Sequence, residues 1–161
     1  SALQGSGGSI WLHLTARAAA AAPFRLTGDS DLDISIWCVF AAFMLIYLPR
    51  LPAIRATLTA EGHVDIANPR LQQARLSGLA GRAQAAHLNS VEAFAPFAAA
   101  VWVAHYAGVD VTLRDGLGLI FVAARTGFIA CYLADLNPWR TVVWSVGFAA
   151  VIALFVAAAV A

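Results

Sequence analysis

The sequence predicts an all-α integral membrane protein, built as a bundle of four transmembrane helices. Of its 161 residues, 61% are hydrophobic and 12% are charged, which lies outside the usual balance of a soluble domain. Four apolar stretches are each long enough to cross ~30 Å of hydrocarbon at ~1.5 Å per residue. They cover residues 34–51, 80–106, 113–133 and 139–160. Short polar links after the second and third stretches force neighbouring helices to run antiparallel.

Residues 1–33 form an N-terminal extension in front of the predicted membrane domain, which covers residues 34–161. Residues 1–9 are rich in glycine and serine, a composition typical of a flexible linker. Residues 10–33 contain no apolar run long enough to cross a membrane, so we assign them no structure.

The first predicted helix begins after Asp33 or Ser35, either of which could cap it. Its end is predicted near Leu51, because Pro49 and Pro52 flank that position. Proline lacks the backbone N–H that a helix needs, and it disfavours helical geometry in the residue before it.

Residues 56–79 form the one long connection in the predicted bundle. The segment is polar, and its Asn68-Pro69 pair marks a turn. The simplest interpretation is a solvated loop. Loops on rigid scaffolds also bind ligands, so Arg70 and Arg75 remain candidates for contacts with a charged substrate.

Arginines are distributed unevenly across the predicted membrane. Six lie on the side of the long connection: Arg50, Arg55, Arg70, Arg75, Arg82 and Arg140. Three lie on the other side: Arg17, Arg25 and Arg114. By the positive-inside rule, residues 56–79 are cytoplasmic and both termini are outside. All ten basic residues are arginine, which suits a GC-rich coding sequence and favours a bacterial inner membrane.

Composition also argues against several other classes of function. The net charge of +1 gives no basic excess for nucleic acid, and no glycine-rich phosphate loop is present. Gly116-Leu117-Gly118 is better interpreted as small residues at a helix contact. Cys38 and Cys131 lie in apolar runs and the histidines are scattered, so we predict no disulfide and no metal site.

The second predicted helix carries a polar stripe, formed by Arg82, Asn89 and Glu92. At about 100° per residue, Asn89 lies about 20° round from Arg82, and Glu92 falls on a neighbouring part of that face. A charged residue inside a membrane span normally faces protein or water, which indicates a functional site. The same residues could instead hold helices in register, as buried amides and ion pairs often do. The residues alone leave both interpretations open.

Arg125 lies about twelve residues into the third predicted helix, near the middle of the membrane. An unpaired charge there costs several kcal/mol, so Arg125 needs a partner. Glu92 is the one carboxylate comparably placed, and we predict a structural Arg125–Glu92 ion pair, within a chain or between chains. Tyr132 lies on nearly the same face as Arg125, where its hydroxyl could contact a ligand or a lipid headgroup.

Five positions of the second predicted helix share the spacing of a known signature: Arg82, Asn89, Glu92, Pro96 and Phe97. This pattern resembles the second helix of the MAPEG family, the membrane-associated proteins in eicosanoid and glutathione metabolism. Residues 124–132, Ala-Arg-Thr-Gly-Phe-Ile-Ala-Cys-Tyr, followed by Arg140, are similar to that family's third helix and the turn after it. With the order and spacing of the hydrophobic runs, the resemblance covers roughly residues 34–161.

The resemblance implies a membrane-bound, glutathione-dependent transferase or peroxidase that acts on lipophilic electrophiles. Many family members bind glutathione as cosubstrate between adjacent protomers, near the cytoplasmic side. By motif position, four residues would hold its polar backbone: Arg82, Asn89, Glu92 and Tyr132. Arg140 would be the catalytic residue, because a nearby guanidinium lowers the pKa of a thiol and raises the fraction of attacking thiolate. The position of Arg140 also fits an interfacial anchor.

The resemblance also implies a homotrimer of four-helix protomers, surrounded by membrane lipids. We expect the second helices to lie nearest the trimer axis, because small residues permit close helix approach. The small residues of that helix are Ala83, Ala86, Ser90 and Ala93.

Two positions depart from the family pattern. Family enzymes commonly carry an arginine four residues before the position of Asn89, where this chain has Ala85. Several members have tyrosine or histidine where this chain has Phe128. Gln84 or a loop arginine could compensate for the lost contacts. The departures leave a second class open, a non-catalytic lipid-binding scaffold or accessory subunit of a membrane complex.

Overall fold

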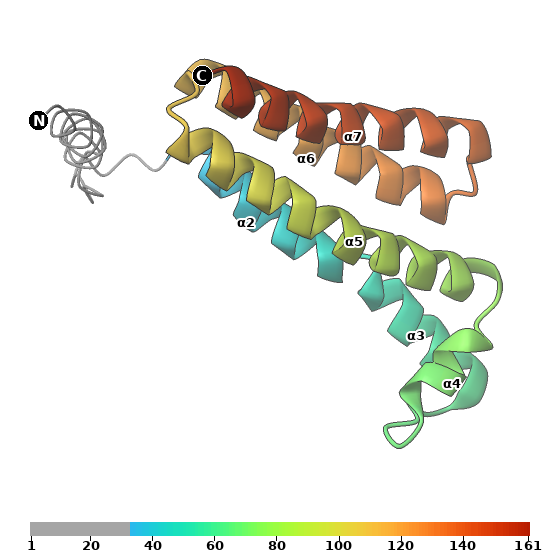
Figure 1. Ribbon diagram of the computed structural model, residues 1–161. Coiled ribbons are helices and arrows are strands. Elements are labelled where there is room, and N and C mark those ends of the chain that lie inside the picture. The colour runs from blue at the N-terminus through green and yellow to red at the C-terminus, as the bar shows by residue number, and fades with distance from the viewer. Residues whose placement is uncertain (1–32) are drawn as a thin grey trace, which may run out of the picture. The chain divides into compact units, whose positions relative to one another are not determined.

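A computed structural model of the chain describes residues 33–161 (Figure 1). The predictions for residues 1–9 and 10–33 therefore lie outside the described part, apart from Asp33. The described residues form α-helices and no strand, which confirms the predicted all-α class. The helices are α2 (Ile34–Tyr47), α3 (Arg50–Glu61), α4 (Pro69–Ala74), α5 (Gly78–Tyr106), α6 (Val111–Leu133) and α7 (Asn137–Val160).

The first helix breaks at Pro49 but resumes as α3, which continues to Glu61. The prediction that residues 56–79 form a loop is therefore wrong for their first part. Pro52 is tolerated because it lies in the first turn of α3, where a backbone N–H has no helical partner to lose. Gly62, with a φ of 74°, ends α3 in a left-handed conformation that glycine adopts without strain.

The rest of this connection folds around the side chain of Gln72, which is 2% exposed. Its Nε2 donates to Oε2 of Glu61 at 2.8 Å and to the carbonyl of His63 at 3.0 Å. Its Oε1 accepts the backbone N–H of Asp65 at 2.9 Å. α4 begins at Pro69, directly after Asn68, so the predicted Asn68-Pro69 turn is the start of this short helix. The connection is therefore polar but ordered around a buried amide.

Among the described residues, three helical segments are long and apolar enough to cross a membrane: Ile34–Glu61, Val111–Leu133 and Asn137–Val160. They identify the chain as an integral membrane protein. α5 is the longest helix, with 29 residues, but its polar side chains make it less apolar than these three. A fourth crossing by α5 stays a prediction.

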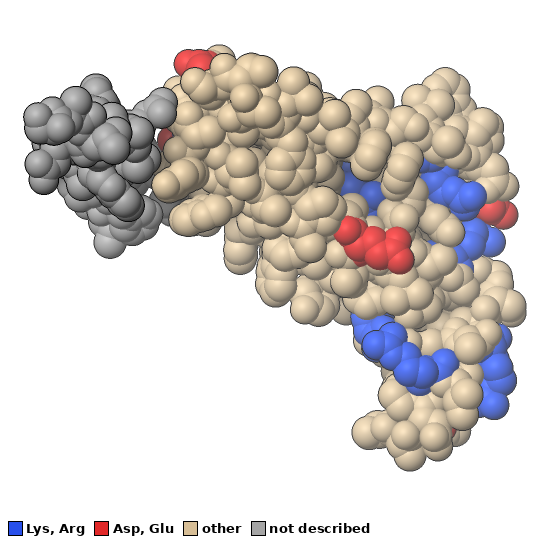
Figure 2. Space-filling model, viewed as in Figure 1, with Lys and Arg blue, Asp and Glu red and all other residues tan. Residues whose placement is uncertain are grey.

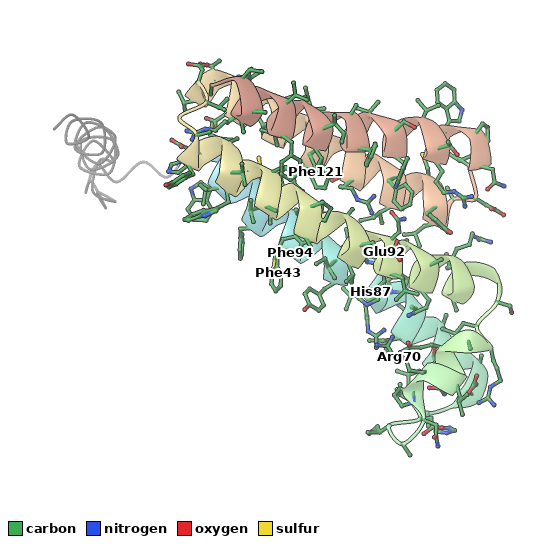
Figure 3. The ribbon with its side chains drawn as sticks, in the orientation of Figure 1. Phe43, Arg70, His87, Glu92, Phe94 and Phe121 are labelled. Carbon is green, nitrogen blue, oxygen red and sulfur yellow. The ribbon has the colours of Figure 1, made fainter. Side chains whose placement is uncertain are left out.

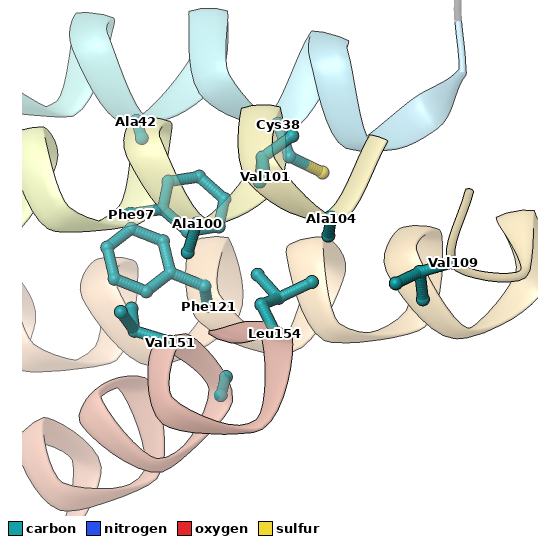
Figure 4. Close-up of a cluster of buried hydrophobic side chains, with 11 residues drawn as sticks. Cys38, Ala42, Phe97, Ala100, Val101, Ala104, Val109, Phe121, Val151 and Leu154 are labelled. Atoms are coloured by element: carbon teal, nitrogen blue, oxygen red, sulfur yellow. The ribbon is translucent and has the colours of Figure 1, made fainter. Parts of the chain in front are cut away.

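α5 contacts each of the other described helices and therefore positions the bundle. Beside it, the rings of Phe97 and Phe121 stack with their centroids 3.8 Å apart and their planes inclined by 9°. Val101 and Leu154, both fully buried, belong to the same hydrophobic cluster (Figure 4). This cluster fixes the spacing of α5, α6 and α7, the helices that carry the predicted site residues.

The small residues of α5 pack mainly within the chain. Ala83, Ala86 and Ser90 are all buried in the single protomer. They allow the neighbouring helices of the same chain to approach α5, and so they give no support for placing α5 at a trimer axis. That placement stays a prediction.

α2 begins and α5 ends at the end of the bundle opposite α4 (Figure 1). There a charged cluster joins the start of α2 to α5 and α6. Arg114, 6% exposed, donates hydrogen bonds to the carboxylate of Asp33 and to Nδ1 of His105. The side chain of Asp33 makes no capping hydrogen bond to α2, so the prediction that Asp33 could cap this helix is wrong. The N–H of Ser35 is bonded instead to Oδ1 of Asp115 at 2.8 Å.

Candidate functional site

Neutral partners from α5 hold Arg125 inside the bundle. Its side chain projects from α6 and is 4% exposed. Nη1 donates to Oδ1 of Asn89 at 3.0 Å, and Nη2 donates to Oγ of Ser90 at 3.1 Å. The hydroxyl of Ser90 donates its own hydrogen to the carbonyl of Ala86 at 2.8 Å, so its oxygen is available to accept. Asn89 of the predicted polar stripe thus binds Arg125, and Ser90 is a partner that sequence reasoning missed.

Glu92 forms no ion pair with Arg125 within the described chain. The Nη groups of Arg125 already donate to Asn89 and Ser90. Glu92 is exposed at the midpoint of the helix Gly78–Tyr106, about 21 Å from each end at about 1.5 Å per residue (Figure 3). The predicted pair is therefore not formed within one chain, and a pairing between chains stays a prediction.

Two aromatic rings of α6 lie between two guanidinium groups, one from α6 and one from the start of α7. Cζ of Arg125 lies 4.3 Å from the ring centroid of Phe128. The rings of Phe128 and Tyr132 are T-shaped, with centroids 5.3 Å apart. Cζ of Arg140 lies 4.3 Å from the centroid of the Tyr132 ring. We call these four residues the Arg–aromatic stack. The stack brings Tyr132 and Arg140, two of the predicted site residues, into contact. Within it, the ring of Phe128 presents its aromatic face to the guanidinium group of Arg125.

Arg82 lies beside the turn between α6 and α7. Its Nε donates to the carbonyl of Leu133 at 3.3 Å, and its Nη1 lies 3.5 Å from Oδ2 of Asp135. Asp135 has a φ of 61°, a conformation that aspartate adopts more readily than most residues. Since Leu133 directly follows Tyr132, Arg82 approaches the same end of α6 as the stack. Sequence reasoning missed Asp135, although its place in a short polar link was a usable signal.

A cavity of about 190 Å³ lies between α5, α6 and α7. Its polar lining consists of Asn89, Glu92 and Arg125. Its larger apolar residues are Pro96, Phe121, Trp144, Phe148 and Val151. The cavity therefore brings one charged wall and several apolar walls together, an arrangement that suits an amphiphilic ligand or a polar and an apolar ligand side by side.

The apolar wall contributed by α7 begins one helical turn beyond Arg140. Trp144 and Phe148 follow Arg140 at spacings of four residues, so the three lie on one face of α7. The rings of Trp144 and Phe148 stack with centroids 5.2 Å apart. Sequence reasoning missed both residues, although their spacing from Arg140 was a signal that could have found them.

Gln84 and Arg70, the candidates to compensate for Ala85, lie apart from the cavity in one chain, and compensation by either stays a prediction. Gln84 is buried, accepts a hydrogen bond from Nη1 of Arg50 at 3.3 Å and donates to Oε1 of Gln73 at 3.3 Å. Arg70 donates to the same oxygen of Gln73 at 3.5 Å. These side chains form a separate polar group at α3 and α4, and they do not line the cavity between α5, α6 and α7.

The sequence profile of the MAPEG family matches residues 34–160. No curated protein and no solved structure matches the chain. The matched region includes the polar stripe of α5, the Arg–aromatic stack and every residue that lines the cavity.

Proposed function

Because the chain belongs to the MAPEG family, we propose that it is a membrane-bound, glutathione-dependent transferase or peroxidase acting on lipophilic electrophiles. The family comprises membrane proteins of eicosanoid and glutathione metabolism, and this chain has three apolar helices long enough to cross a membrane. The observation that carries the proposal is the contact between Arg140 and Tyr132, next to residues that line a cavity with both charged and apolar walls.

The charges of the predicted site residues suit glutathione, which carries two carboxylates, one ammonium group and a thiol. In the proposal, Arg82 binds a carboxylate and Glu92 binds the ammonium group. Oδ1 of Asn89 is bonded to Arg125, so its Nδ2 remains to donate to a carbonyl of the tripeptide. Tyr132 borders the site at the end of α6. The assignment of these four binding residues rests on their positions in the family motif.

Arg140 stabilises the thiolate in the proposed reaction. The face of the Tyr132 ring attracts the guanidinium, and no side-chain acceptor among the described residues takes its N–H groups. A positive charge near sulfur lowers the pKa of the thiol. The thiol loses its proton to water, sulfur forms a bond to an electrophilic carbon, and the leaving group departs with its electron pair.

The peroxidase reaction would use the same thiolate. With a lipid hydroperoxide, sulfur takes the terminal oxygen and an alcohol is released after protonation. A second glutathione then forms the disulfide and water, so the two thiols supply both electrons of the reduction.

The apolar walls of the cavity support an electrophile that arrives from lipid. Phe121, Trp144 and Phe148 present aromatic surface next to the polar wall. Because Trp144 lies one turn beyond Arg140, an apolar substrate on this surface would lie near the proposed thiolate. Binding of this kind brings the reacting atoms together without requiring a charge on the substrate.

We further propose that the chain assembles as a homotrimer of four-helix protomers, in which α5 is the fourth membrane crossing. The exposed carboxylate of Glu92 supports assembly, since a charge facing lipid at mid-membrane depth is costly. A neighbouring protomer would cover Glu92 and complete the glutathione site. In the proposed topology, residues 34–161 form the membrane domain, residues 56–79 face the cytoplasm of a bacterium and both termini lie outside.

Titration of the purified protein with glutathione tests the proposed activity, because a thiolate absorbs in the near ultraviolet. We expect saturable growth of thiolate absorbance in the wild type and its loss in Arg140→Ala. Arg55→Ala is the matched control, because it removes an exposed arginine of α3 that does not line the cavity. Binding without ionisation would contradict the catalytic role. No response to millimolar glutathione, with lipid retained through purification, would favour the alternative of a non-catalytic lipid-binding scaffold.

A further inference from the structure

Positive charge is concentrated on the segment that contains α3 and α4. The arginines of this segment are Arg50, Arg55, Arg70 and Arg75. Within the described residues, none of the four forms an ion pair. The two acids of the same segment are already engaged, Glu61 with Gln72 and Asp65 with the backbone N–H of Asn68. Figure 2 shows blue side chains spread over this end of the molecule.

Two of these arginines are held by a chain of amide side chains. Arg50 donates to Gln84 at 3.3 Å, Gln84 donates to Oε1 of Gln73 at 3.3 Å, and that oxygen also accepts from Arg70 at 3.5 Å. Gln84 is buried, so it fixes the link between α3, α4 and α5. Since the partners are neutral amides, they orient the guanidinium groups without neutralising them.

Arg50, Gln73 and Gln84 line one hollow between α3, α4 and α5. We call it the arginine hollow; Arg70 is tied to it through Gln73. The other walls are partly apolar, and they include Ile54, Val64 and Leu76. The hollow thus has one cationic donor in its lining, Arg50, and a second beside it, Arg70, next to apolar walls. This arrangement suits a ligand whose charged and apolar parts adjoin.

The arginine hollow is expected to lie close to the lipid headgroups of one membrane leaflet. Arg50 follows Ile34 by 16 residues within the apolar segment Ile34–Glu61, which is about 24 Å at about 1.5 Å per residue if the break at Pro49 changes the rise little. The hydrocarbon core is ~30 Å thick, so Arg50 lies within one side-chain length of the headgroups of the nearer leaflet.

We propose that the arginine hollow binds the headgroup phosphate of an anionic phospholipid. A guanidinium group can donate two parallel hydrogen bonds to a phosphate, and Arg50 uses one of its five N–H donors for Gln84. Clusters of arginine next to a membrane helix attract anionic lipids by about 1 kcal/mol for each residue. A zwitterionic lipid carries an ammonium group that two uncompensated arginines would repel. The apolar walls take the first carbons of the acyl chains.

Native mass spectrometry of the full chain in mild detergent tests this site. We expect added phosphatidylglycerol to bind more tightly than phosphatidylcholine. Arg50→Gln and Arg70→Gln should each weaken phosphatidylglycerol binding by about fivefold, because each removes a direct hydrogen-bonded contact to the phosphate worth about 1 kcal/mol. Arg55→Gln is the matched control, because it removes the same charge from α3 outside the hollow, and it should change binding by less than about twofold.

A second variant distinguishes lipid binding in the arginine hollow from nonspecific electrostatic attraction of anionic lipid. Gln73→Ala leaves the charge unchanged but releases Arg70, so it should also weaken phosphatidylglycerol binding. Thermal unfolding in phosphatidylcholine alone, equal for all variants, would show that they fold. Equal losses in Arg55→Gln and Arg50→Gln, equal binding of both lipids, or displacement of the lipid by inorganic phosphate at constant ionic strength would each overturn the proposal. The proposed function assigns no role in glutathione binding to Arg50, Arg70 or Gln73. A glutathione titration of the same variants therefore distinguishes failure of the lipid site from failure of the proposed function.

Discussion

The guanidinium carbon of Arg140, at the start of α7, lies 4.3 Å from the ring centroid of Tyr132, near the end of α6. A cation over an aromatic face is stabilised by about 0.5–1 kcal/mol at an exposed site. The ring therefore positions Arg140, and the hydroxyl of Tyr132 is not part of that contact. A tyrosine in a glutathione site can act through its ring, by positioning an arginine, or through its hydroxyl, by contacting the ligand.

Substitution of Tyr132 tests which role applies. Tyr132→Phe keeps the ring, so we expect the thiolate absorbance of bound glutathione to remain close to that of the wild type. Tyr132→Leu removes the ring and should lower the ionised fraction about two- to fivefold, which corresponds to the energy of the cation–π contact. Equal losses in the two variants would instead assign the function to the hydroxyl, as a direct contact to the ligand.

Arg140→Ala and Arg82→Ala should separate ionisation from binding. Arg140→Ala removes the charge next to sulfur, so we expect lower kcat with little change in the dissociation constant of glutathione. Arg82→Ala removes the cation that we propose to hold the tripeptide, so we expect weaker binding and a nearly unchanged kcat at saturation. Steady-state kinetics and calorimetric titration measure the two effects. If both variants lost binding alone, Arg140 would be an anchor and not a catalytic residue.

If the proposed trimer forms, Glu92→Gln should lower its thermal stability and shift it toward monomers. The carboxylate lies midway along α5 and has no ion-pair partner among residues 33–161, so we expect its partner to come from a neighbouring chain. Removing one member of a buried pair typically costs about 3–5 kcal/mol. Unfolding temperature and native mass spectrometry give the readout.

Glu61→Gln is the matched control for Glu92→Gln. It makes the same change at an exposed carboxylate, and a glutamine oxygen can still accept from Gln72. We expect it to leave the oligomeric state unchanged. Unchanged stability in Glu92→Gln would show that Glu92 has no partner in another chain.

The polar stripe of α5 shows how far sequence reasoning reaches at this site. Helical periodicity correctly predicts that Asn89 and Glu92 share a face, because the angle between residues is a property of the helix alone. It does not predict which of them Arg125 contacts, because that depends on how far apart α5 and α6 pack and on the rotamer of a long side chain. The structure selects Asn89, together with Ser90 from the side of the stripe.

The region of α3 shows the same limit for the fold. Pro49 correctly predicts a break in the first helix, since the effect of a missing N–H is local. Whether the chain resumes a helix afterwards depends on packing against α5, which no local rule contains. The all-α class and the ends of α5, α6 and α7 are close to those predicted from apolar runs and polar links, because hydrophobicity over some 20 residues determines them.

The paired glycines of α6 provide the last prediction, because they look alike in sequence and differ in the structure. A Cβ built at Gly118 would lie 3.3 Å from both Cβ and Sγ of Cys38 on α2, whereas a Cβ at Gly116 would meet nothing within 4 Å. Alanine is favoured over glycine inside a helix by about 0.5–1 kcal/mol. Gly116→Ala should therefore be neutral or stabilising, and Gly118→Ala should be destabilising, because the cost of overpacking, typically about 1–3 kcal/mol, exceeds the gain. Thermal unfolding in detergent measures the difference, and adding Cys38→Ala to Gly118→Ala should restore part of the loss by removing the sulfur. Equal unfolding temperatures for the two glycine variants would show that α2 and α6 pack less closely than the structure has them.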